Sequence, residues 1–109
     1  MTDAVVVLIT VPSREVGERI AAALLEQRLA ACVNFVTPIQ SWYIWQGELC
    51  RDEEMLLVVK TSSDVFRERL IPAVRSLHPY EVPEIIALPV ATGHDDYLAW
   101  IADTVGQSS

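Results

Sequence analysis

The stretch from Cys32 to Thr61, CVNFVTPIQSWYIWQGELCRDEEMLLVVKT, determines the fold that we expect for this chain. Valine, isoleucine and aromatic residues are concentrated before Gln46-Gly47-Glu48, and the unbroken apolar run Met55-Leu56-Leu57-Val58-Val59 follows it. This combination is typical of two β-strands joined by a tight turn. We predict one strand over residues 32–45 and a second over residues 49–61. Both are longer than the usual strand of about 5–6 residues, so this hairpin should extend beyond its own domain.

The tip of the predicted hairpin carries three large aromatic side chains, Trp42, Tyr43 and Trp45. A two-stranded ribbon cannot bury that much aromatic surface by itself. We therefore expect another chain to complete the packing around the tip.

The hairpin also separates the two cysteines of the sequence. With the turn at residues 46 and 47, Cys50 lies opposite Tyr43, whereas Cys32 lies far along the other arm. A disulfide requires Cα atoms within roughly 7 Å, so both thiols should be free, as in a reducing compartment.

The N-terminal residues lack a basic region, and the apolar run at 4–11 is too short to span a membrane. We therefore predict a cytoplasmic protein without a membrane partner.

The length and composition fit one domain covering residues 1–109. A hydrophobic fraction of 51% is sufficient for a core and argues against disorder. The net charge of −7 disfavours nucleic acid and anionic membranes as partners, because both repel an acidic surface.

The rest of the chain adds two strands and three helical segments. We expect strands at 4–11 and 85–90, a helix from Ser13 to about residue 29, a second helix from the cap cluster at 61–64 to His78, and a short helix from Asp95 or Asp96.

Proline residues mark the expected edges and irregularities of these elements. Pro38 and Pro89 cannot donate to a ladder, which indicates edge strands and a bulge near Thr37. Pro72 lies inside the second helical pattern and should produce a kink or a local irregularity.

This order of elements predicts an α+β, ferredoxin-like βαββαβ fold with a short C-terminal helix. Right-handed crossovers place both long helices on one face of the sheet. The first, third and fourth strands are apolar at consecutive positions, so they also direct apolar side chains toward the uncovered face. A soluble monomer rarely exposes such a patch, which predicts a closed homo-oligomer, either a dimer or a trimer.

Five segments of the sequence resemble the CutA family of divalent-cation tolerance proteins. They are AACVN at 30–34, SWYIWQG at 41–47, DEE at 52–54 leading to Lys60-Thr61, HPYEVPEI at 78–85, and YLAW at 97–100. The resemblance covers about residues 5–101. It implies a homotrimer similar to the PII signalling proteins, a role in tolerance to copper and other divalent metals, and no enzymatic activity, hence no catalytic residues.

The resemblance also bears on copper. In some bacterial members, copper binding is associated with a cysteine in the first strand and a His-His pair before Pro-Tyr. This sequence has Ile9 and Leu77 at two of those positions, and only His78 matches. The resemblance therefore implies that the chain holds Cu(II) or another divalent cation, weakly bound.

Two residues are candidate metal ligands. His78 can bind a metal through a neutral imidazole nitrogen, or it can interact with free carbonyls at a helix end. Cys32 can bind a soft metal as a thiolate, or it can serve as a small buried hydrophobe. The structural alternative is favoured for both, and His94 is expected to be exposed and inert.

Four residues are candidates for a cleft between subunits: Glu54, Lys60, Tyr43 and Trp45. Glu54 and Lys60 share a face of the second hairpin arm. They can line a site for a small anion, or pair with each other or with a neighbouring subunit. Two functions follow: a trimer that handles divalent metal ions, most often copper, and a PII-like sensor or interaction module that binds a small ligand between its subunits.

Overall fold

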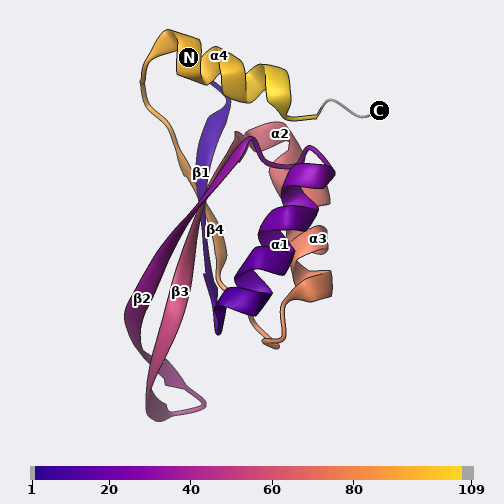
Figure 1. Ribbon diagram of the computed structural model, residues 1–109. Coiled ribbons are helices and arrows are strands. Elements are labelled where there is room, and N and C mark those ends of the chain that lie inside the picture. The colour runs from indigo at the N-terminus through magenta and orange to yellow at the C-terminus, as the bar shows by residue number, and fades with distance from the viewer. Residues whose placement is uncertain (1, 107–109) are drawn as a thin grey trace.

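Four antiparallel strands form one sheet in the order β2-β3-β1-β4, as the ferredoxin-like prediction requires (Figure 1). The computed structural model describes residues 2–106; residues 1 and 107–109 of the predicted domain lie outside this range. The elements are β1 (Ala4–Val11), α1 (Arg14–Glu26), β2 (Cys32–Trp45), β3 (Glu48–Ser62), α2 (Ser63–Val65), η1 (Phe66–Leu70), α3 (Ile71–Leu77), β4 (Ile85–Pro89) and α4 (Asp95–Thr104). In the part of the chain that the structure describes, no helix is long and apolar enough to cross a bilayer.

The hairpin of β2 and β3 has the predicted geometry. Gln46 and Gly47 adopt φ values of 51° and 80°, as a tight type I′ turn requires, and Cys50 pairs with Tyr43. The register shifts between Val36 and Ile39, which confirms the bulge expected beside Pro38. The part of β3 before Met55 pairs only with β2, so the hairpin extends past β1 and β4 (Figure 1).

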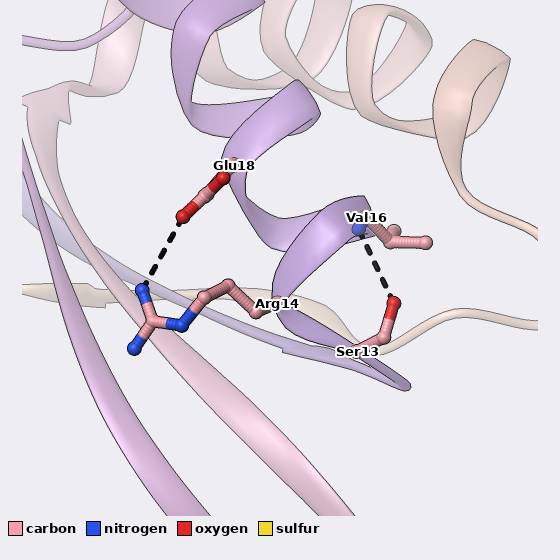
Figure 2. A network of polar contacts seen from close by, with 4 residues as sticks. All are labelled: Ser13, Arg14, Val16 and Glu18. Atoms are coloured by element: carbon pink, nitrogen blue, oxygen red, sulfur yellow. Dashed lines mark hydrogen bonds and ion pairs between the residues drawn. The ribbon is translucent and has the colours of Figure 1, made fainter.

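Helix α1 begins where its sequence predicts. The Val16 amide donates a hydrogen bond to Ser13 Oγ at 3.3 Å, and an ion pair joins Arg14 to Glu18 at 3.4 Å one turn later (Figure 2). The helix ends at Glu26, three residues before the predicted end. The cause is Arg28, whose φ of 59° lies in the left-handed region and turns the chain toward β2.

We expect Arg28→Gly to stabilise the fold by about 0.5–1 kcal/mol, because glycine adopts positive φ without the steric cost that an arginine side chain carries. Chemical denaturation at fixed protein concentration measures the gain. Arg67→Gly serves as a control, because the same exchange inside a helical segment should be destabilising by about 1 kcal/mol. Equal effects of both substitutions would contradict this explanation of the helix end.

The second helical region has a local irregularity, as we predicted from the position of Pro72. Residues 66–70 form a π-helical segment, and α3 then begins with Pro72 in its first turn, where the missing amide costs little. Ser62 is the N-cap residue, but its hydroxyl bonds to Asp64 Oδ1 at 2.5 Å instead of capping a backbone amide.

The core lies between the sheet and the helices. Alternate residues of the two central strands are fully buried there, beside Ile20 and Leu24 of α1 and Leu70 and Val74 of the second helical region. A Cβ on Gly17 would lie 2.2 Å from Met55 Cε, so a larger residue at this position would require the end of the Met55 side chain to move.

The other face of the sheet is apolar, and among residues 2–106 neither α1 nor α3 covers it; α4 adjoins it at one end only. Figure 1 shows α1 and α3 on the same side of the sheet. The pairings of Leu8 with Val58 and with Ile86 place these side chains together on the opposite side, where Ile86 is 48% exposed. The same face carries Val6, Leu56 and Leu88. This arrangement confirms the uncovered apolar face that the sequence predicted. We call it the open face below.

Candidate functional site

A cleft of about 710 Å³ lies between the overhanging hairpin and the connector from α3 to β4. The hairpin contributes Trp42, Tyr43, Trp45 and Glu54, and the connector contributes Tyr80 and Glu84. Three of the four residues predicted for a cleft therefore line the same cavity.

The centre of the cleft is a pair formed by a carboxylate and a phenol. Tyr80 donates its hydroxyl hydrogen bond to Glu54 Oε2 at 2.6 Å, and Glu54 is only 7% exposed. Burial, followed by this hydrogen bond, raises the pKa of Tyr80 well above its usual range. The bond therefore connects the connector to the centre of β3.

A second pair of the same kind lies nearer the hairpin tip. The Tyr43 hydroxyl donates to Asp52, which shares a face of the hairpin with Glu54. The hydrogen bond to the Asp52 carboxylate raises the pKa of Tyr43 to about 12, because ionisation would place two negative charges side by side.

We expect Tyr43 to ionise near pH 12 in an ultraviolet titration of the folded protein, and Asp52→Asn to move that step toward the ordinary value of about 10. Because the folded pKa is raised, this pair stabilises the fold below pH 10 and loses its effect as the pH rises toward 12. Glu53→Gln, which changes an adjacent exposed carboxylate, is the control. A Tyr43 step that does not respond to Asp52→Asn would contradict the assignment.

His78 lies behind the cleft and uses both ring nitrogens within its own chain. Nε2 lies 2.8 Å from the Thr10 carbonyl oxygen, to which it donates, and Nδ1 accepts from the Tyr80 amide at 3.2 Å. The imidazole is 7% exposed and lies 4.8 Å from the Tyr80 ring, centroid to centroid. His78 thus holds the connector against β1, and a metal bound to either nitrogen would replace one of these hydrogen bonds.

Cys32 and Lys60 form a separate group at the opposite end of the open face. They are paired residues of β2 and β3, and Lys60 Nζ lies 3.9 Å from Cys32 Sγ. The ammonium also donates to Asn34 Oδ1. Tyr97 of α4 adjoins this group: burial, followed by the neighbouring Cys32 thiol, raises the pKa of its phenol.

Within one chain, the predicted site residues therefore form two groups. Glu54, Tyr43 and Trp45 line the cleft, whereas Lys60 lies six positions farther along β3, about 20 Å away. Cys32 and His78 are likewise at opposite ends of the sheet. Among residues 2–106, no three histidine, cysteine or carboxylate side chains are grouped so that they could hold a metal ion.

Two residues of the site were not among the predicted ones. Tyr80 was quoted only as part of a motif, although its place between Pro79 and Pro83 in a stiff connector could have indicated a positioned side chain. Asn34 is two residues from Cys32, and this spacing places both side chains on one face of a strand. His94 is exposed as predicted, and its Nδ1 accepts a hydrogen bond from the Tyr97 amide at 3.4 Å, which caps α4.

The architecture and the cleft define a class of protein: a small ferredoxin-like α+β domain with one uncovered sheet face and a long hairpin. Residues 5–104 match the model of the CutA1 divalent ion tolerance protein family. The chain belongs to this family.

Members of this family are similar to this protein over nearly its whole length. "Divalent-cation tolerance protein CutA" of Thermus thermophilus is 55% identical over 101 residues, covering 93% of this chain and 97% of the relative. The solved structure of the protein from that organism superposes with a TM-score of 0.91 at 54% identity and covers 94% of this chain and 99% of its own. The CutA1 structure from Oryza sativa superposes with a TM-score of 0.92 at 40% identity and covers 98% and 97%.

Proposed function

We propose that this protein acts as a homotrimer without enzymatic activity in the response of the cell to divalent metal ions, with Cu(II) as the ion. The observation that carries this proposal is the open apolar face beside a cleft whose walls hold carboxylates and phenols. Membership in the divalent ion tolerance family supplies the class of ligand.

The open face supports the homotrimer. Its valine, leucine and isoleucine side chains each gain roughly 1.5–3 kcal/mol on burial, and a second copy of the chain offers a face of the same kind. Trp42 and Ile44 at the hairpin tip are 65% and 68% exposed and would be covered in the same assembly. Threefold closure also gives the edge strands β2 and β4 partners in neighbouring subunits.

The arrangement of donors favours weak binding of the ion between subunits. A site of three grouped ligands is absent from residues 2–106 of one chain, so a complete coordination shell needs donors from a second subunit. His78 and Cys32 remain the candidate nitrogen and sulfur ligands for Cu(II), a metal that imidazole and thiolate both suit.

The two free thiols also agree with our placement of the protein in the cytoplasm, although relatives from Arabidopsis thaliana and Archaeoglobus fulgidus are named as chloroplastic and periplasmic.

Titration of reduced, tag-free protein with Cu(II) tests the metal proposal. We expect a heat and a visible absorption change at about one ion per subunit or less, both reduced in His78→Gln and in Cys32→Ser. Cys50→Ser, which changes a free cysteine outside the proposed ligand set, is the control. If Cu(II) produces no signal at stoichiometric levels, and neither ligand variant differs from the wild type, the protein does not hold copper directly.

The cleft favours a second candidate function, a PII-like sensor that binds a small ligand between its subunits. Its volume of about 710 Å³ lies within the usual range for small-molecule pockets. A thermal-shift screen of nucleotides and metabolites tests this candidate. We expect a stabilising ligand to lose its effect in Glu54→Gln and in Tyr80→Phe; a screen in which nothing stabilises the protein would count against it.

A further inference from the structure

Two charged side chains lie on the open face without an opposite charge in their own chain. Glu54 is almost completely buried, and its hydrogen-bond partner is the neutral Tyr80 hydroxyl. Lys60 is half-buried, and its partners, Asn34 Oδ1 and Cys32 Sγ, are side chains without positive or negative groups of their own. Within residues 2–106, the ion pairs lie on helix α1 alone.

The two charges cannot compensate each other within one subunit. Both belong to β3 and point to the same face, but six positions separate them, which is about 20 Å of extended strand. The side chains between them on that face are Leu56 and Val58, which are apolar. Removing a charge from water is unfavourable unless an opposite charge or several hydrogen bonds compensate it.

We propose that Lys60 of one subunit forms an ion pair with Glu54 of a second copy, and that this pair completes the cleft over Tyr80. The inference rests on the proposed homo-oligomer. The apolar strip of the open face has Lys60 at one end and the buried Glu54 at the other, with the exposed Asp52 two positions beyond Glu54 on the same face. A second copy therefore offers complementary charge as well as complementary apolar surface. In a cyclic assembly the same contact repeats at every interface, so no Lys60 or Glu54 is left without a partner.

The pair has a consequence for the cleft. In one chain the cavity is lined by Glu54, Tyr43 and Trp45 but has no cation from β3. In the assembly, the ammonium group of the neighbouring Lys60 joins the same cavity. The four residues that the sequence indicated for a single cleft then meet, three from one subunit and one from the next.

Charge reversal tests the pair. We expect Lys60→Glu and Glu54→Lys each to raise the subunit dissociation constant at least about tenfold, because each places like charges together on a covered face. The double variant K60E/E54K should return to within about threefold of the wild type. Sedimentation equilibrium over a dilution series measures all four proteins. The double variant E26K/R75E makes the same exchange at exposed positions of α1 and α3, and should behave as the wild type.

The neutral variants Lys60→Met and Glu54→Gln keep the test decisive if a reversed charge prevents folding. Each variant should reduce the free energy of association. In the double variant, the reduction should be smaller than the sum of the two separate reductions. Additive effects, or a double reversal that dissociates as readily as the single variants, would overturn the ion pair. A loss of association with Lys60→Glu alone, together with wild-type association that strengthens when phosphate is added at constant ionic strength, would assign Lys60 to an anion from solution instead. A wild-type protein that sediments as a single chain would refute the proposed trimer itself.

Discussion

Leu8→Glu is expected to convert the proposed trimer to single chains or to unfolded protein at micromolar concentration. Leu8 lies at the centre of the open face, paired with Val58 on one side and Ile86 on the other. In the trimer each copy would bury a carboxylate without a partner, at a cost of several kcal/mol per subunit. Light scattering after size-exclusion chromatography measures the change in mass, and the wild-type melting temperature should rise with protein concentration.

The control for this experiment is Leu25→Glu. Leu25 belongs to α1 and is 40% exposed, so the same change of side chain there leaves the open face intact. We expect this variant to keep the wild-type mass and to differ in stability by no more than about 0.5 kcal/mol. A wild-type protein that is a stable single chain, or a Leu8→Glu variant that remains a trimer, would contradict the role assigned to the open face.

His78→Ala is expected to destabilise the fold by about 2–3 kcal/mol in metal-free buffer. The substitution removes a nearly buried imidazole, so the Thr10 carbonyl and the Tyr80 amide lose their hydrogen bonds to it. It also leaves a cavity between the connector and β1. Because Tyr80 donates to Glu54, the cleft should loosen as well. Chemical denaturation with excess chelator measures the stability at fixed protein concentration.

His94→Ala is the matched control, because this second histidine is exposed and makes one long hydrogen bond as the cap of α4. We expect it to cost about 1 kcal/mol or less. If His78→Ala were harmless without metal and destabilising only when Cu(II) is present, the imidazole would act as a ligand and not as a structural connection. Loss of stability under both conditions, with Cu(II) binding also reduced, would assign both roles to His78.

The regular part of the fold could be predicted because local signals agree with the tertiary structure there. β1 begins and ends at the predicted residues, and so does β2. The turn at Gln46 and Gly47 sets the register of the hairpin, so the pairing of Cys50 with Tyr43 followed from counting positions. The predicted end of α1 was three residues late. The helical spacing of the sequence continues past Glu26, but the left-handed backbone of Arg28 turns the chain out of the helix.

The candidate site was harder to predict because its contacts join residues that are distant along the chain. Glu54 and Tyr80 are 26 positions apart, and Thr10 and His78 are 68 apart. Strand alternation indicates which face a side chain takes, but it does not indicate which loop reaches over that face. From the sequence alone, each of Glu54 and His78 therefore had more than one possible role.

By itself, the sequence determined the strand and helix order, the two edge strands and the apolar character of the open face. These properties follow from residue-by-residue alternation, helical spacing and the backbone limits of proline and glycine. Only the tertiary structure decided that the Tyr80 hydroxyl caps the Glu54 carboxylate, that His78 holds the connector, and that Lys60 lies apart from the cleft of its own chain. The physical reason is that a buried polar group takes whichever partner the packed chain brings within hydrogen-bonding distance, and that distance is a property of the fold.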